Sequence, residues 1–144
     1  MSEKIVVGYD GSDVAKRAID FAVRQATAQN GSVLVVHVLE WSAYSFLTPE
    51  ELEERHGRRR EEIERAEAAL MSPLKATISK AGVPVETMIK YGHIAKTLCE
   101  VARQTGATQM VVGRDGDGGL ATRVFGSVAG SLVQIAPVAC TIVP

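Results

Sequence analysis

Short apolar runs typical of β-strands alternate with helix-patterned segments along the whole chain, and this alternation is the strongest constraint on its fold. The strand-like runs cover residues 4–9, 33–39, 83–91, 109–113 and 139–143. Between the first two runs, apolar residues recur at helical spacing from Ala15 to Ala26, and Asn30 and Gly31 mark the expected helix end. A strand–helix–strand repeat of this kind predicts a parallel sheet with helices on both faces.

Three further helices are predicted by their own start and stop signals, which gives four in all. A long charged helix is expected to begin at Thr48 and Pro49, an N-cap followed by a first-turn proline, and to end at Ala81 and Gly82. Gly57 interrupts its pattern and indicates either a break or a mobile entry to the ligand crevice. The other two helices are expected at residues 94–105 and 127–135.

The character of each strand predicts its place in the sheet. Residues 33–39 are apolar at nearly every position, and residues 5–7 and 110–112 share this feature, which is typical of strands buried on both faces. Residues 83–91 alternate apolar and polar side chains, so they are expected at one edge, with the short last strand at the other. The predicted fold is α/β, a single doubly wound domain over residues 1–144 with a five-stranded parallel sheet in the order 3-2-1-4-5. That order reverses the connection between strands one and four and opens a crevice at their carboxyl ends, where such sheets bind ligands.

Composition narrows the class of partner and the compartment. The 16 basic and 17 acidic residues give a formal net charge of −1, so neither nucleic acid nor an anionic membrane is an expected partner. No apolar run approaches the roughly 20 residues of a membrane helix, and the first residues lack the features of a signal peptide. Cys99 and Cys140 have neither metal-ligand nor redox spacing and are expected to be small buried hydrophobes. We therefore expect a cytoplasmic domain without membrane insertion.

Two loops at the predicted crevice have the chemistry of an anion site. The sequence Asp-Gly-Ser at residues 10–12 follows the first strand, and a glycine-rich stretch at residues 113–119 follows the fourth, with Gly126 and Ser127 at the next helix start. Glycines let backbone amides approach an anion, and a helix N-terminus offers unpaired N–H groups and partial positive charge. Neither a P-loop motif nor a G-x-G-x-x-G motif is present. The pattern predicts a phosphate-bearing ligand.

The spacing Gly113-x2-Gly116-x9-Gly126-Ser127, together with IVVGYDGS, VLVVHV and FGSVAGSLVQIAPVACTIVP, resembles the nucleotide-binding universal stress proteins over the whole chain. The resemblance implies an adenine nucleotide, ATP or else ADP or AMP. It implies that Asp10 meets the adenosine and that the Val38 backbone reads the adenine edge. It also implies that Val112 and Gly113 lie near the ribose, and that the residues near the phosphates are Gly116, Gly126, Ser127 and Val128. Ser12 either contacts the ligand or caps the first helix. The site residues implied are Gly8, Tyr9, Asp10, Ser12, Val38, Val112, Gly113, Asp115, Gly116, Gly126, Ser127 and Val128.

One departure from the family pattern concerns charge. Asp115 and Asp117 stand where many nucleotide-binding members have a hydroxyl residue followed by a basic residue or histidine. Two carboxylates disfavour a triphosphate unless a cation lies between them. Three alternatives stay open: Arg114 and Arg123 offset this charge, magnesium or manganese bridges the aspartates and the nucleotide, or both aspartates face solvent and cap the glycine turn.

These features together predict an ATP-binding regulatory protein of the stress response with little or no rapid hydrolysis. No general base, P-loop lysine or metal cluster is visible to support an efficient ATPase. The uncharged last strand, residues 138–143, is an open pairing template, and the resemblance implies a homodimer through it. A regulatory protein partner would read the nucleotide state. Two alternatives stay open, a slow metal-dependent nucleotide hydrolase and a nucleotide-free structural dimer that acts by protein interaction.

Overall fold

The sheet of this protein is the five-stranded parallel sheet that the sequence predicts. The structure, a computed structural model, describes residues 3–40, 49–78, 80, 82–115 and 127–144. The strands are β1 (Lys4–Gly8), β2 (Ser32–Glu40), β3 (Val85–Gly92), β4 (Gln109–Gly113) and β5 (Ala139–Val143). They lie in the order β3-β2-β1-β4-β5, and every pair is parallel. The predicted fold class and strand order are confirmed.

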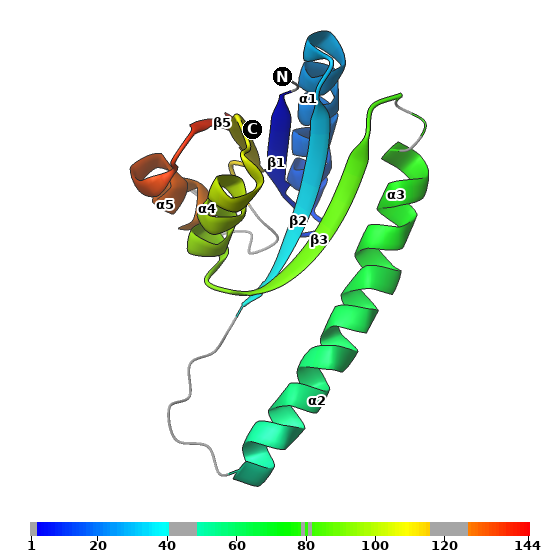
Figure 1. Cartoon of the computed structure of the whole chain (residues 1–144), viewed down its shortest axis with the longest axis vertical. Helices are drawn as coiled ribbons and strands as arrows, with labels where there is room; N and C mark the ends of the chain where they lie inside the picture. Colours follow the sequence, from blue (N-terminus) through cyan, green and yellow to red (C-terminus); the bar gives the residue numbers. More distant parts are fainter. Residues whose placement is uncertain (1–2, 41–48, 79, 81, 116–126) are drawn as a thin grey trace.

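Helices cover both faces of this sheet and make two cores (Figure 1). The helices are α1 (Asp13–Gln29), α2 (Pro49–Ala66), the π-helix η1 (Glu67–Met71), α3 (Ser72–Ile78), α4 (Ile94–Thr105) and α5 (Ser127–Ile135). On one face, Leu98 of α4 and Leu132 of α5 are fully buried against the strands. On the other, Ala18 of α1 and Met71 of η1 are buried to the same degree. Because strand side chains alternate between the faces, the central strands contribute to both cores.

The long charged helix differs from its prediction in where it changes course. It begins at Pro49 as expected, but α2 runs through Gly57 without interruption, so the predicted break at Gly57 is wrong. The irregularity lies instead at η1, where the Ser72 N–H donates to the Glu67 carbonyl oxygen five residues before it. The described residues therefore form five α-helices rather than four, because the π-helix divides the long one.

The ends of α1 and α4 follow the expected stop signals. Asn30 ends α1 in the left-handed region, with φ of 53°, and its N–H donates to the Ala26 carbonyl oxygen. Gly106 ends α4 with φ of 69° in the same way. Both stops return the chain to the amino end of the next strand.

Because Gly57 lies in a regular helix, replacing it by alanine is expected to stabilise the protein. A Cβ atom at position 57 would meet nothing within 4 Å in the described part of the chain. Alanine loses less backbone freedom on folding, so the free energy of unfolding should rise by about 0.5–1 kcal/mol. Urea unfolding of the two proteins measures this difference. A less stable Gly57→Ala variant would mean that α2 is broken at this residue.

Candidate functional site

The loop after β1, residues 10–12, is tied to its surroundings by its own side chains. The N–H and hydroxyl groups of Ser12 both donate to Asp10 Oδ1, the first at 2.9 Å. The same Ser12 oxygen accepts from the Ala15 N–H at 3.2 Å and so caps α1. Ser12 is buried and performs the capping role that the sequence left open, whereas Asp10 is exposed. The loop therefore presents the Asp10 carboxylate and the N-terminus of α1 at the carboxyl edge of the sheet.

Tyr9 and the end of β1 are held from the side of β2. The Tyr9 N–H donates to the Val36 carbonyl oxygen at 2.9 Å, and His37 Nδ1 donates to the Tyr9 carbonyl oxygen at 2.7 Å. The ring of Tyr9 is buried, and this burial, with a smaller contribution from the Asp10 charge, raises the pKa of its hydroxyl. His37 is thus a hydrogen-bonded core histidine, as its position in an apolar strand suggests.

The loops after β1 and β4 meet at the reversal point of the sheet. A Cβ atom on Gly113 would lie 2.9 Å from Val14 Cγ1, in the first turn of α1 directly after the 10–12 loop. A Cβ atom on Gly8 would lie 3.2 Å from Val112 Cγ1. A Cβ atom at Gly113 would therefore crowd α1, and one at Gly8 would crowd Leu98 of α4 as well as β4, so glycine at both positions favours the close approach of the elements that carry the two loops.

Three predicted contact residues lie on one side of the sheet. Val38 and Val112 are buried in the core under α4 and α5, and Val128 packs against the same cluster. A hollow of about 200 Å³ opens beside Val128, at the carboxyl ends of β2 and β3. The residues that line this hollow are Glu40, Gly92, His93, Ile94, Ala95, Val128 and Ser131.

Sequence reasoning missed the residues of this hollow other than Val128. His93 is exposed, and its Nδ1 accepts from the Lys96 N–H at 3.4 Å and caps α4. The sequence signal that could have pointed to this hollow is Gly92, a glycine at the turn from a strand into a helix. In the structure its φ is +148°. The N-termini of α1, α4 and α5 all lie at this edge, because each helix returns from the carboxyl end of one strand to the amino end of the next.

The glycine-rich stretch after β4 is described only at its start. Gly116, Asp117 and Gly126 lie outside the described residues, and for Ser127 the structure gives the helical backbone alone. Asp115 is half-buried, and one of its carboxylate oxygens, Oδ2, lies 3.5 Å from Arg114 Nε. The other, Oδ1, is buried with no hydrogen-bond partner in the part of the chain that the structure describes. Asp115 is therefore half-buried beside Arg114, and Asp117, the other residue of these alternatives, lies outside the described residues.

The two cysteines and the potential metal ligands are the other reactive groups among the described residues. Cys99 is buried and Cys140 half-buried, both are free thiols, and burial raises the pKa of each, which disfavours the thiolate. Among the described residues, no group of three histidine, cysteine, aspartate or glutamate side chains could hold a metal ion. Within the same residues, every helix is too short or too polar to cross a bilayer.

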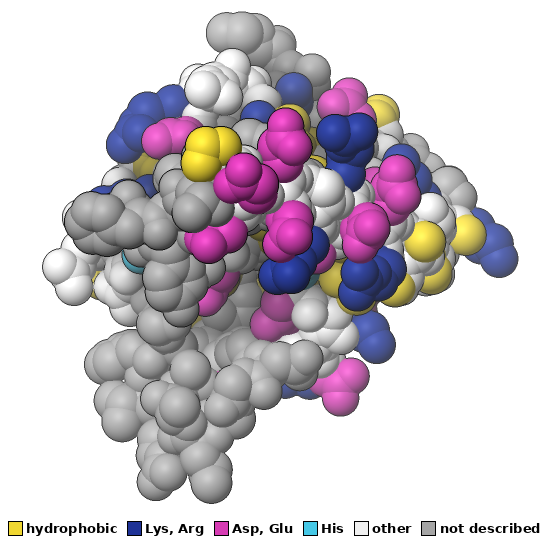
Figure 2. Space-filling view, turned by 90° about the horizontal axis from the view of Figure 1, so that it is seen from below, with side chains coloured by type: hydrophobic (Ala, Val, Ile, Leu, Met, Phe, Trp, Pro, Cys, Tyr) yellow, Lys and Arg dark blue, Asp and Glu magenta, His cyan; other side chains and the backbone are white. Residues whose placement is uncertain are grey.

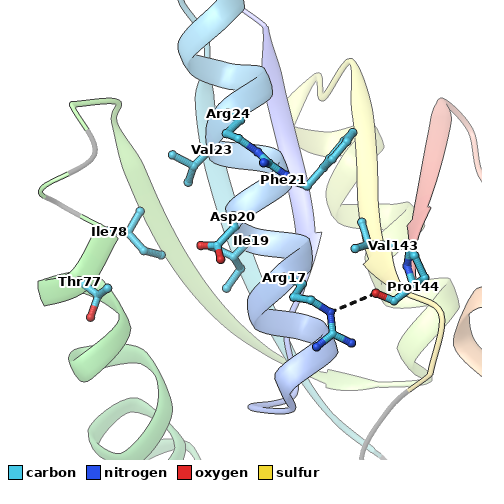
Figure 3. Close-up of a pocket in the computed structure, with 10 residues that line it drawn as sticks. All are labelled: Arg17, Ile19, Asp20, Phe21, Val23, Arg24, Thr77, Ile78, Val143 and Pro144. Atoms are coloured by element: carbon cyan, nitrogen blue, oxygen red, sulfur yellow. Dashed lines mark hydrogen bonds between the residues drawn. The ribbon is translucent and has the colours of Figure 1, made fainter.

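A larger hollow lies on the opposite face and takes no part in the candidate site. It measures about 620 Å³ and is bounded by α1, α3 and the end of β5 (Figure 3). Ile19, Val23 and Ile78 give it an apolar lining, and Arg17 Nε donates to the Pro144 carbonyl oxygen at 3.1 Å. None of the predicted nucleotide residues lines it. Figure 2 shows acidic and basic side chains interleaved on the described part of the lower face, rather than a patch of one sign.

Solved structures of the same fold include several universal stress proteins. The protein UspA from Lactobacillus plantarum superposes with a TM-score of 0.85 at 24% identity, covering 99% of this chain and 97% of that chain. A universal stress protein solved in complex with cAMP is 26% identical, with a TM-score of 0.63 and coverage of 99% and 96%. One from Archaeoglobus fulgidus, solved in complex with dAMP, is 23% identical with a TM-score of 0.67, covering 99% and 98%.

Relatives identified by sequence carry the same family name. The chain is 33% identical over 138 residues to a universal stress protein of Thermus aquaticus, and the match covers 95% of each chain. It is 29% identical over 142 residues to the universal stress protein YxiE of Bacillus subtilis, which covers 94% of each. The universal stress protein family matches the chain over residues 1–144. With this match over its full length and the 3-2-1-4-5 sheet that its strands form, the chain belongs to the universal stress protein family.

Proposed function

We propose that this chain binds an adenine nucleotide, preferentially ATP, between the loops that follow β1 and β4. The observation that carries the proposal is the contact of Gly113 with Val14, because it brings the 10–12 loop and the glycine-rich loop together at the reversal point of the sheet. The N-termini of α1 and α5 at this edge supply unpaired N–H groups for an anionic ligand. The solved cAMP complex of a protein 26% identical to this chain supports the adenine moiety.

The role we propose for nucleotide binding is regulatory, in the cytosol, with little or no rapid hydrolysis. The side chains that the structure describes around Asp10 are hydrogen-bonded within the loop itself, and none is a histidine placed to activate water. Nucleotide occupancy would then alter a surface that a protein partner reads. Gly116, Gly126 and Ser127 retain their proposed place at the phosphates on the strength of the family spacing.

A second candidate, a slow metal-dependent nucleotide hydrolase, is favoured by one observation. The buried Oδ1 of Asp115 lacks a hydrogen-bond partner among the described residues, and such an oxygen is suited to a cation. Magnesium or manganese held there with Asp117 would neutralise the charge that the two aspartates place near the phosphates. The metal would be part of the bound nucleotide complex rather than a resident of the empty protein.

We also propose a homodimer through the free edge of β5. Val133 is 71% exposed and Ile135 42% exposed, and they are two of only three large hydrophobic residues exposed among the described ones. Both belong to α5, which packs beside β5, and no charged residue occurs after Arg123. A second copy paired antiparallel to β5 would cover the strand edge and these side chains together.

Calorimetric titration with ATP tests the nucleotide proposal. We expect micromolar affinity, roughly −8 kcal/mol, and at least a tenfold loss in the variant Gly116→Val with Gly126→Val, because added side chains prevent close approach of backbone amides to phosphate. The variant Gly57→Val makes the same change on an exposed helix and should bind normally. Equal affinity in the native protein and the double variant would exclude this site.

Two further measurements with the same protein separate the alternatives. If Asp115 and Asp117 bridge a metal, ATP affinity should fall in excess chelator, and the change of both to asparagine should remove that dependence. Unchanged affinity in chelator would exclude the metal bridge. Mass spectrometry of ligand released from the purified protein identifies the resident nucleotide, and its absence together with no ATP binding would leave the nucleotide-free dimer.

A further inference from the structure

The 10–12 loop lies against the π-helix η1. The Cδ2 atom of Leu70 is 3.0 Å from the point that a Cβ atom on Gly11 would occupy. Among the described residues, it is the one atom within 4 Å of that point outside the glycine's chain neighbours. Gly11 has a φ of +84°, a conformation that residues with side chains rarely adopt. The loop backbone is therefore held from one side by β1 and from the other by Leu70.

The π-helix η1 joins α2 to α3 and rotates α2 about the helix axis, so that side chains of both helices face the same side of the sheet. Met71 and Ile78 are buried in the core, and they define the inward face of η1 and α3. Because an α-helix turns about 100° per residue, Ala66 would lie roughly 120° from Ile78 around an unbroken helix. The extra residue in the π turn returns Ala66 to within roughly 20° of that face. In agreement, Ala66 is only 8% exposed.

The same change of phase docks α2 onto the edge of the sheet. Glu62 accepts a hydrogen bond from the Tyr91 hydroxyl, and the guanidinium carbon of Arg59 lies 5.1 Å from the centroid of the Tyr91 ring. In an unbroken α-helix, Arg59 and Glu62 would point roughly 100–160° away from the inward face. The π turn thus satisfies the contacts of both halves of the long helix, and it does so beside the 10–12 loop, in keeping with the frequent occurrence of π turns at functional sites.

We propose that Leu70 is a positioning residue for nucleotide binding, which holds the 10–12 loop in place without touching the ligand. This inference rests on the proposed nucleotide site. Asp10 is bonded to Ser12, and Ser12 caps α1, so a displacement of Gly11 moves the carboxylate and the helix N-terminus relative to Gly113. Nucleotide affinity therefore depends on the side chain at position 70.

Leu70→Ala and Leu74→Ala form a matched pair for the test. Both leucines are half-buried and pack against the same core cluster, but Leu70 is the one that contacts Gly11. We expect Leu70→Ala to weaken ATP binding about tenfold, because small misplacements of binding groups have effects of at least this size. Leu74→Ala should lose comparable thermal stability and keep its affinity within about twofold. Leu70→Met, which restores a long apolar side chain, should recover most of the affinity.

Amide hydrogen exchange in the nucleotide-free protein separates this inference from the nucleotide proposal. The Ser12 and Ala15 N–H groups donate within the loop, and their exchange should be about tenfold faster in Leu70→Ala than in Leu74→Ala. Faster exchange without any ATP binding by the native protein would refute the nucleotide site while Leu70 still held the loop. Equal exchange in the two variants, or equal ATP affinity, would overturn the positioning role. If Leu70→Ala does not fold, Leu70→Val against Leu74→Val gives the same comparison.

Discussion

Replacing Gly92 by alanine is expected to lower the free energy of unfolding by roughly 3 kcal/mol, from backbone strain and overpacking together. Gly92 ends β3 with a φ of +148°, where a Cβ atom is strained. That Cβ atom would also lie 2.6 Å from Oγ1 of Thr97, a buried side chain in α4 that has little room to move. Since the stability of a domain is about 5–15 kcal/mol, the loss should be plain in urea unfolding as a lower midpoint at unchanged slope.

Gly106→Ala is the control for the Gly92 variant. Gly106 also has a positive φ, of 69°, but a Cβ atom there would meet nothing within 4 Å in the described residues. The free energy of unfolding of Gly106→Ala should therefore fall by only about 1 kcal/mol. Adding Thr97→Ala to Gly92→Ala should recover the stability lost to the steric clash, but not the stability lost to the strained φ of residue 92. A Gly92→Ala protein as stable as the Gly106→Ala protein would show that the turn into α4 can rearrange.

A protein carrying Val133→Lys and Cys140→Pro is expected to run as a monomer, whereas we expect the native protein to run as a dimer of twice its 15.4 kDa. The Val143 carbonyl oxygen accepts from the Arg114 N–H, so Val143 faces β4 and, by alternation, Cys140 faces the free side of β5. Proline at 140 then removes a donor from the free edge and spares the ladder to β4. Lysine at 133 places a charge among the apolar side chains of the proposed interface.

Each change in the dimer test has a neighbour that serves as control. Cys140→Ala alters the side chain and keeps the N–H group, and Gln134→Lys adds the same charge one position along α5, at another exposed residue. Both controls should stay dimeric at tens of micromolar by light scattering or sedimentation. A native protein that is monomeric at that concentration contradicts the homodimer, and a double variant that remains dimeric moves the interface elsewhere.

The strand order could be predicted because a strand buried on both faces has a nearly continuous apolar sequence, whereas an edge strand alternates apolar and polar residues. The run at 33–39 is apolar at every position but His37, since β2 is covered on both faces, whereas Lys90 on β3 faces solvent at an edge. The π-helix could not be predicted in this way. Between Glu50 and Arg65 almost every side chain that the structure describes is exposed, so these described side chains form no apolar stripe whose phase could shift, and Gly57 was the more visible irregularity.

The parts of the candidate site where two elements approach closely could be predicted, because they require glycine. The burial and contacts of individual polar side chains could not. Gly8 and Gly113 mark contacts between neighbouring elements that any Cβ atom would obstruct. Asp115 carries no such mark, because the burial of one carboxylate oxygen depends on how the chain turns after β4. His93 is marked by no sequence motif either, although its position at the start of α4 places it in the lining of the hollow near Val128.

The position of β1 in the centre of the sheet has a consequence for the order of folding during synthesis. One side of β1 pairs with β2, the next strand in the chain, but the other side pairs with β4, which is synthesised much later. The Lys4 carbonyl oxygen, for example, accepts from Thr108, 104 residues further along the chain. Contacts of such long sequence separation form slowly, because a large loop must close first. A nascent chain that ends before β4 has an open strand at what will become the middle of its sheet, and this apolar edge is a site for wrong pairing on the ribosome.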